Sequence, residues 1–258
     1  MTPKTDVFIC GVPFWNPTYE DFFSWWKSVI QGEDRSSPIL CLANPNTINL
    51  MLWDEQVYRD LQQCDVWVND GIGIRIASKW RGVDSPYNFA GTDLMPRLFS
   101  EDLPQTAFFF GAKDEVNEQA CRIITERHPN LKIVGRMHGY CDWDNDAVPM
   151  IADSGADILM AALGQPKQEQ FMIRNRDKLN VKVQVTCGGM FDFFSGTKPR
   201  APKIMRATGM EWLYRLSLEP KRMFHRYVLG NPYFLWRALL ATKGDKRKLA
   251  ELSDVSIR

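Results

Sequence analysis

An aspartate at the end of an expected β-strand is the residue best placed to do chemistry. The apolar run Asp65–Asn69 predicts a strand, and Asp70 follows it directly, beside Gly71 and Gly73. Glycines let a ligand approach the backbone closely, and an unperturbed aspartate, with a pKa of about 3.9, is ionised at neutral pH. Asp70 can therefore act as a general base that accepts a proton from a substrate hydroxyl group.

Two other interpretations of this segment stay open. An aspartate just before a helix commonly caps its N-terminus, which would give Asp70 a structural role. The run from Gly71 to Ala77 also matches part of the dinucleotide fingerprint G-x-G-x-x-G/A. However, Ala77 comes one position too late, and no acidic residue ends a second strand about 20 positions further on. A nucleotide-binding, NAD(P)-dependent oxidoreductase with a Rossmann-like core is therefore the alternative function.

A second polar segment, from Gly164 to Glu169, lies where an expected strand gives way to a helix. The N–H groups of a helix start and the ammonium group of Lys167 can bind a phosphate or a sugar oxygen. An ordinary turn and helix start explain the spacing equally well. The segment is a candidate binding site that its spacing alone does not establish.

Asp142 and Asp144 have the D-x-D spacing with which many glycosyltransferases hold a divalent metal ion and a nucleotide diphosphate. An acidic loop that caps the next helix explains the same residues, so we expect no metal site and no cofactor. The histidines His128, His138 and His225 lack the spacing of a zinc site, and neither a G-x-S-x-G elbow nor a P-loop is present. Hydrolase and NTPase functions thus lack their usual motifs.

A parallel sheet is needed to bring these segments together. Between Pro38 and Gly196, short apolar runs alternate with helix-like stretches, which is the rhythm of βαβ units. The expected strands are Ile39–Ala43, Asp65–Asn69, Ala107–Gly111, Leu131–Gly135, Asp157–Leu163 and Val181–Cys187, and the expected helices include Thr47–Gln63, Lys113–Arg127 and Pro166–Lys178. This pattern predicts an α/β fold with a Rossmann-like, mostly parallel sheet flanked by helices.

Ligands of such sheets bind beyond the carboxyl ends of the strands, so the residues that follow each strand are candidates for the site. These residues are Asn44, Asp70, Gly71, Gly111, Gly135, Gly164, Gln165, Gly188 and Gly189. They are polar side chains and glycines, which suit a polar ligand held close to the backbone.

The chain changes character after Thr197. Residues 198–258 hold 14 Lys and Arg against 5 Asp and Glu, a net charge of +9, whereas residues 1–197 carry −8. The strand pattern also stops, while proline, aromatic and arginine residues become frequent. We therefore expect a catalytic α/β core in residues 1–197 and a basic, aromatic-rich helical appendage in residues 198–258. Such a charge suits an anionic partner: nucleic acid, anionic lipid or a pyrophosphate-bearing substrate.

The cysteine pattern and the lack of visible targeting signals indicate where in the cell the protein is expected. The six cysteines are scattered singly and predict reduced thiols, mostly in the core. No signal peptide is visible, and no run approaches the roughly 18 apolar residues of a membrane span. We expect a cytoplasmic protein whose only membrane contact is peripheral.

Several longer segments closely resemble the WecG/TagA/CpsF glycosyltransferases, which form glycosyltransferase family 26. Late in the chain these segments are Asp157–Glu169, Gly188–Gly196, Lys198–Lys203, Gly209–Leu216 and Glu219–Arg222. Earlier segments fit in the same order: Asn44–Thr47, Asn69–Gly73, Ala90–Leu94 and His138–Tyr140. The resemblance covers roughly Asp6 to Leu240, and its late motifs are long and specific.

The resemblance implies a metal-independent, inverting enzyme of hexosyl or N-acetylhexosaminyl type. Such an enzyme moves a sugar from a UDP-sugar donor to an undecaprenyl-pyrophosphate-linked acceptor during surface polysaccharide or wall-polymer synthesis. It would work on the inner face of the cytoplasmic membrane, with an anionic membrane surface and not nucleic acid as partner. Asp70 matches the proposed general base. The expected substrate-binding residues are Asn44, Thr47, Gly111, Tyr140, Gly164, Lys167, Gln168, Asp192, Arg215, Arg222 and Arg226.

Two positions depart from the family pattern. Leu42 stands where a threonine is frequent, and Asn88 stands where an arginine often precedes the Ala90–Leu94 segment. The departures leave the donor sugar open. A non-catalytic nucleic-acid or membrane adaptor would need only the basic tail, and the polar residues gathered at strand ends argue against it.

Overall fold

The computed structural model describes residues 3–253, with side chains as far as residue 241. Six strands form one parallel sheet in the order β4-β3-β8-β7-β5-β6, and two short strands form a separate antiparallel hairpin. The strands are β1 (Val7–Ile9), β2 (Val12–Phe14), β3 (Ile39–Ala43), β4 (Val66–Asn69), β5 (Gln105–Gly111), β6 (Leu131–Met137), β7 (Ile158–Ala162) and β8 (Val183–Thr186). The expected strands and the parallel sheet are confirmed.

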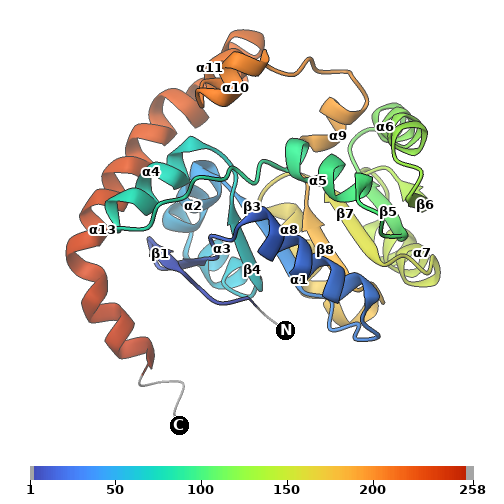
Figure 1. Cartoon of the computed structure of the whole chain (residues 1–258), viewed down its shortest axis with the longest axis horizontal. Helices are drawn as coiled ribbons and strands as arrows, with labels where there is room; N and C mark the ends of the chain where they lie inside the picture. Colours follow the sequence, from blue (N-terminus) through green and yellow to red (C-terminus); the bar gives the residue numbers. More distant parts are fainter. Residues whose placement is uncertain (1–2, 254–258) are drawn as a thin grey trace.

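Helices cover both faces of the sheet (Figure 1). The α-helices are α1 (Tyr19–Gln31), α2 (Pro45–Trp53), α3 (Glu55–Leu61), α4 (Ile72–Trp80), α5 (Gly91–Ser100), α6 (Asp114–Arg127), α7 (Val148–Asp153), α8 (Lys167–Asn175), α9 (Met190–Phe194), α10 (Lys203–Ala207), α11 (Glu211–Leu218), α12 (Pro220–Met223) and α13 (Gly230–Ser253). Single turns of π or 3₁₀ helix lie at η1 (Trp143–Ala147), η2 (Arg176–Lys178) and η3 (Phe224–Leu229).

Both faces of the sheet are buried. Successive strand residues point to opposite faces, and apolar side chains on each face pack against helices. Ile39, Cys41 and Ala43 of β3 belong to one apolar cluster, whereas Leu40 and Leu42 belong to the other. The first cluster packs against α2, α3, α4, α8 and α13, and the second against α1, α5, α6 and α9. Two cores thus hold the sheet from either side.

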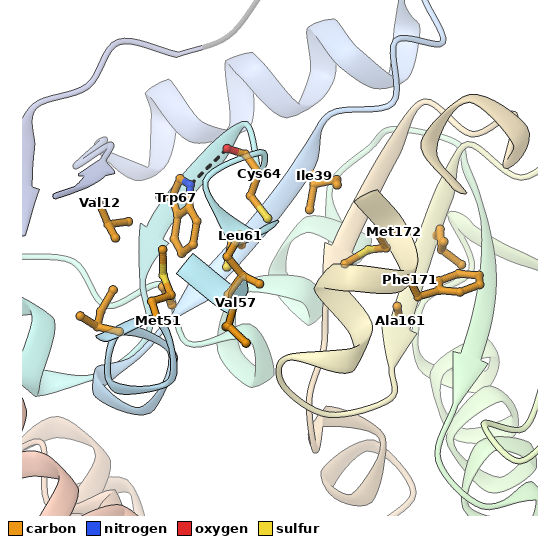
Figure 2. Close-up of a cluster of buried hydrophobic side chains, with 14 of the residues drawn as sticks. Val12, Ile39, Met51, Val57, Leu61, Cys64, Trp67, Ala161, Phe171 and Met172 are labelled. Atoms are coloured by element: carbon orange, nitrogen blue, oxygen red, sulfur yellow. Dashed lines mark hydrogen bonds between the residues drawn. The ribbon is translucent and has the colours of Figure 1, made fainter. Parts of the chain in front are cut away.

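Figure 2 shows part of the first core, where Trp67 of β4 lies between side chains of α2, α3 and β2. Its indole Nε1 donates a 3.2 Å hydrogen bond to the carbonyl oxygen of Cys64. The ring is fully buried, and this bond satisfies its only polar group. Four of the six cysteines are likewise buried and all six are free, as the sequence predicted.

Two local predictions are wrong. The single helix expected over Thr47–Gln63 divides at Asp54, whose backbone is extended and whose carboxylate caps α3 by accepting from the backbone N–H groups of Gln56 and Val57. Gly135 does not end its strand, because β6 continues to Met137. It lies against Phe108 of β5 instead, where a Cβ atom would come within 2.5 Å of the ring.

From Lys203 to Ser253 the chain is mostly helical, which confirms the helical appendage. After α9 the chain crosses to α10 and α11, and α13 then runs along the flank of the molecule beside α2 and α4 (Figure 1). Phe234 and Ala238 of α13 are buried in the first core. Within the described residues, no helix combines the length and apolarity that crossing a membrane requires.

Candidate active site

A pocket of about 710 Å³ lies at the carboxyl ends of the strands, where the appendage covers them. Residues that follow β3, β4, β5, β7 and β8 form one wall, which we call the sheet wall: Asn44, Asp70, Ala112, Gly164, Gln165, Gln168, Gly188 and Gly189. Basic residues after Thr197 form the facing appendage wall: Lys198, Arg215, Arg222 and Arg226. The pocket therefore joins the two charge-distinct parts of the chain.

Asp70 lies on the sheet wall and does not cap the helix that follows. The N-cap of α4 is Gly71, with a φ of 106°, and no side chain caps that helix. The backbone of Asp70 is held from the neighbouring strand end, because its N–H donates to the carbonyl oxygen of Ala43 at 2.7 Å. The Gly71 N–H donates to Oδ1 of Asn88 at 2.8 Å. The carboxylate is thus left for the pocket.

Burial raises the pKa of Asp70 above its ordinary value. Arg215 and Arg226 lower the pKa in part, as does the side chain of Asn44, whereas the carboxylate of Glu211 raises it. A carboxyl group whose pKa is brought closer to neutrality is a better proton acceptor than an ordinary aspartate. The geometry suits a general base next to cationic groups.

Asn44 caps helix α2 and also interacts with Asp70. As the N-cap of α2, its Oδ1 accepts from the backbone N–H groups of Asn46 at 3.1 Å and Thr47 at 3.4 Å. Its amide nitrogen is therefore the group that can interact with Asp70. Thr47 is buried behind this cap, where its hydroxyl accepts from Nε2 of Gln165 at 2.6 Å.

The three arginines of the appendage wall come from three different elements and not from one helix face. Arg215 is in α11, Arg222 in α12 and Arg226 in η3, and the chain turns between them at Pro220. Arg215 donates two hydrogen bonds to Oε1 of Glu211, at 3.1 and 2.6 Å, and its guanidinium lies 4.6 Å from the ring centre of Phe193.

Carboxylates also hold Arg222 and Lys198. Arg222 pairs with Glu219 at 3.0 Å. Lys198 reaches both Glu219, at 3.3 Å, and Asp192, at 2.8 Å. Hydrogen bonds with Arg222 and Lys198 lower the pKa of Glu219, so it is ionised at neutral pH. An anionic ligand could replace these carboxylates as the partner of the cations.

The D-x-D pair lies away from this pocket. Oδ1 of Asp142 accepts from the backbone N–H groups of Asp144 and Asn145, at 3.1 and 3.0 Å, and so caps η1. Asp144 pairs with Arg174 at 3.0 Å. Neither aspartate lines the pocket. The cap is therefore Asp142, and not Asp144 or Asn145, while Asp144 is held by its ion pair.

Nine of the twelve sequence-predicted site residues line the pocket: Asn44, Asp70, Tyr140, Gly164, Gln168, Asp192, Arg215, Arg222 and Arg226. Three do not, namely Thr47, Gly111 and Lys167. Lys167 is exposed at the start of α8. Gly111, with a φ of 118°, lies against the backbone of Ala162, where a Cβ atom would come within 2.4 Å of the carbonyl oxygen. For all twelve residues the catalytic or substrate-binding role stays a prediction, and these three lack the support of a place in the pocket lining.

Sequence reasoning did not select two lysines that line the pocket, Lys113 and Lys198. Lys198 falls in a family-like segment, which was a usable signal. Lys113 lies two residues beyond the expected site residue Gly111, which ends β5.

Gly71 and Gly73 of the dinucleotide-like segment have structural roles, Gly71 through its positive φ at the N-cap of α4 and Gly73 through packing. A Cβ atom on Gly73 would lie 2.4 Å from the Pro45 side chain and 3.7 Å from Phe234, so its small size lets α4 approach α2 and α13. Neither Gly71 nor Gly73 lines the pocket. Nothing in this segment favours the oxidoreductase alternative.

Two proteins with similar sequences are named as glycosyltransferases, as the residues of the pocket suggest. The chain is 27% identical over 249 residues to a Staphylococcus aureus (strain MRSA252) protein and 28% identical over 242 residues to one from Bacillus subtilis (strain 168). The first match covers 95% of this chain and 96% of the relative; the second covers 93% and 92%. Both relatives are named N-acetylglucosaminyldiphosphoundecaprenol N-acetyl-beta-D-mannosaminyltransferase.

The sequence pattern of the "Glycosyl transferase WecG/TagA/CpsF family" matches residues 7–248, which include both walls of the pocket. The chain therefore belongs to the WecG/TagA/CpsF family and is a glycosyltransferase.

Proposed function

We propose that the protein transfers an N-acetylhexosamine from a UDP-sugar to a sugar linked to undecaprenyl diphosphate, with inversion at the anomeric carbon. One observation carries this proposal: the Asp70 carboxyl and the basic side chains of the appendage wall face a single pocket. A base for the acceptor and cations for a diphosphate are the two requirements of such a transfer. The names of the two relatives supply the acceptor class and make N-acetylmannosamine the first donor sugar to test.

The reaction is a single displacement. Asp70 takes the proton of the acceptor hydroxyl as its oxygen attacks the anomeric carbon of the donor. The bond from that carbon to the diphosphate oxygen breaks, and its electron pair leaves with UDP. Arg215, Arg222, Arg226 and Lys198 stabilise the negative charge that develops on the diphosphate. No covalent intermediate with the enzyme is needed.

We propose that these cations take the place of a divalent metal ion. Four basic side chains line the pocket from the appendage side. Arg215 is partly buried between Glu211 and Phe193, which strengthens its interaction with an anion because little water screens it. Arginine also matches the oxygens of a phosphate with two parallel hydrogen bonds.

The outer surface of the appendage suits a membrane interface. Its exposed large apolar side chains, within the described residues, are Ile204, Met210, Leu213, Leu218, Phe224, Val228, Leu229, Trp236, Leu239 and Leu240. Trp53 of α2 is also exposed, and its ring lies 5.7 Å from that of Tyr233. Aromatic rings favour the interface of a bilayer, and basic residues favour anionic head groups. We propose peripheral binding to the inner face of the cytoplasmic membrane, where a lipid-linked acceptor would be reached.

We further propose that residues 1–197 form the catalytic core and residues 198–258 an appendage that completes the pocket. Asp93 of α5 supports this division, because it anchors the start of the appendage through ion pairs to Arg200 and Arg206, at 3.0 and 2.9 Å.

The decisive experiment supplies the protein with UDP-sugars and a synthetic lipid diphosphate that carries N-acetylglucosamine. Mass spectrometry should show a product heavier by one N-acetylhexosamine, and NMR should show the inverted anomeric configuration. UDP should appear in equal amount. The absence of a product with every UDP-sugar tested, from protein that binds UDP, would reject the proposal.

A further inference from the structure

Glu169 is a buried carboxyl group directly behind the pocket. It lies in the first turn of α8 and is fully buried, which is rare for glutamate. Its Oε1 accepts a 2.9 Å hydrogen bond from Nε2 of Gln168. Its Oε2 has no hydrogen-bond partner among the described residues. The carboxyl group is therefore held through one oxygen only, by a residue that lines the pocket.

This burial works against stability. It raises the pKa of Glu169 to about 7, and the side chains of Gln168 and Gln165 lower it only in part. Cys41, on β3, interacts electrostatically with Glu169 but offers no counter-charge, because a thiol is neutral and a thiolate is negative. An apolar side chain of similar size would cost less to bury. A requirement other than stability must therefore explain the carboxyl group.

That requirement is visible in the amide of Gln168. Its Oε1 accepts a 2.9 Å hydrogen bond from the backbone N–H of Gly188, which can only donate. Its Nε2 faces Oε1 of Glu169, which can accept. The two neighbours together fix which end of the amide is oxygen and which is nitrogen. Of the two N–H groups of Nε2, one is used by Glu169 and the other is available to a ligand in the pocket.

We propose that Glu169 is a positioning residue for sugar transfer: it orients the amide of Gln168 so that this residue presents an N–H donor to the substrate. A ring hydroxyl, an acetamido carbonyl or a phosphate oxygen can accept from that donor. Without Glu169 the amide would be held at its oxygen end alone. The substrate would then meet a side chain that must be ordered during binding, at the expense of affinity or rate.

The first test needs no substrate and so does not depend on the proposed function. The variant Glu169→Leu should release Gln168, so the backbone N–H of Gly188 should exchange with solvent at least tenfold faster, as measured by NMR. The amides of α8 should keep their protection. Glu169→Gln, which can still accept from Gln168, should leave the exchange at Gly188 within about threefold of wild type.

Gln170→Leu is the matched control for this measurement. Gln170 lies on α8, as Glu169 does, and its Nε2 donates a 2.9 Å hydrogen bond to Asp60 of α3. The substitution removes this bond and leaves the contact with Gly188 intact. In the Gln170→Leu variant, the backbone N–H of Gly188 should exchange with solvent at the wild-type rate. Faster exchange throughout α8 in Glu169→Leu would show a general structural role and overturn the proposal, as would unchanged exchange at Gly188.

The second test is kinetic and rests on the proposed function. Glu169→Leu should lower kcat/KM for transfer at least tenfold in the wild-type background, but less than twofold in a Gln168→Ala background, because its effect passes through Gln168. Glu169→Gln should recover most of the lost activity. An equal loss in both backgrounds would overturn the proposal. If wild-type protein transfers no sugar, the proposed function fails, while the exchange experiment still decides the role of Glu169.

Melting temperatures separate misfolding from mispositioning. Glu169 has a folded pKa above its unfolded value, so its carboxyl group destabilises the fold increasingly as the pH rises from about 4.5 to about 7. Glu169→Leu should therefore melt at a higher temperature than wild type at pH 8, by a larger margin than at pH 5. A lower melting temperature at pH 8 would show that the carboxyl group serves stability and would contradict the proposal.

Discussion

The sheet wall and the appendage wall of the pocket differ in what holds their polar side chains. On the sheet wall, Asn44 and Gln168 are bonded to backbone N–H groups, those of Asn46 and Gly188. On the appendage wall, Arg215 and Arg222 are bonded to carboxylates of their own segments, Glu211 and Glu219. Backbone hydrogen bonds keep a fixed geometry, whereas an exposed ion pair such as that of Arg222 with Glu219 contributes little stability and exchanges readily.

The difference suggests a division of labour. A rigid wall suits the orientation of a sugar and a base, where small displacements cost rate. A wall of ion pairs suits a diphosphate, which can replace Glu219 as the partner of Arg222 so that this cation is paired in either state. Substitutions in the sheet wall should therefore affect turnover, and those in the appendage wall should affect the handling of the leaving group.

The largest expected effect is that of Asp70→Asn on the sheet wall. The amide cannot take the acceptor proton, so kcat should fall roughly 100-fold or more, the usual scale for a positioned base. UDP binding measured by calorimetry and the melting temperature should stay close to wild type. Turnover at the wild-type rate would show that Asp70 is not the base.

Arg215→Gln should have the next largest effect and should change the pH profile as well. Losing a charged hydrogen bond to the diphosphate, worth about 1.5–3 kcal/mol, should lower kcat/KM roughly 10- to 100-fold. Arg215 also lowers the pKa of Asp70, so its removal should raise that pKa. Because the base must be ionised, the acid limb of the profile should move to higher pH. An unmoved limb would show that Arg215 does not act on Asp70. Arg174→Gln, on the exposed pair with Asp144, is the control.

A smaller effect should separate catalysis from membrane binding within the appendage. Arg222→Glu should impair transfer more than it impairs sedimentation with anionic liposomes, because Arg222 lines the pocket. Trp236→Glu should do the reverse, since Trp236 is 54% exposed and does not line the pocket. If both variants lost transfer and liposome binding to the same extent, catalysis and membrane binding would not be separate functions of the appendage.

The smallest expected effect is that of a chelator. EDTA should leave the rate of transfer unchanged, because the cations of the appendage wall neutralise the diphosphate. Loss of activity with EDTA, restored by Mg²⁺ or Mn²⁺, would show that the appendage wall is not sufficient and that a metal ion takes part.

The amino-acid sequence alone predicted the sheet and much of the pocket, because the signals for both are local. Alternating apolar residues mark the strands, and parallel strands bring their carboxyl ends to one edge, so Asn44, Asp70 and Gly164 could be grouped without coordinates. The basic character of the appendage was visible as a charge difference. Local patterns failed at Gly135, where the strand continues beside Phe108, and at Asp54, whose carboxylate caps a new helix and so divides the expected one.

Only the tertiary structure decided how the polar groups are paired. The bond of Gln168 to Gly188 joins residues 20 positions apart, and the burial of Glu169 depends on how α8 packs on the sheet. The three arginines meet the pocket from separate elements because the chain turns between them. Sequence periodicity reports which face a residue shares with its neighbours, whereas hydrogen-bond partners and burial depend on distances between elements that only the folded chain sets.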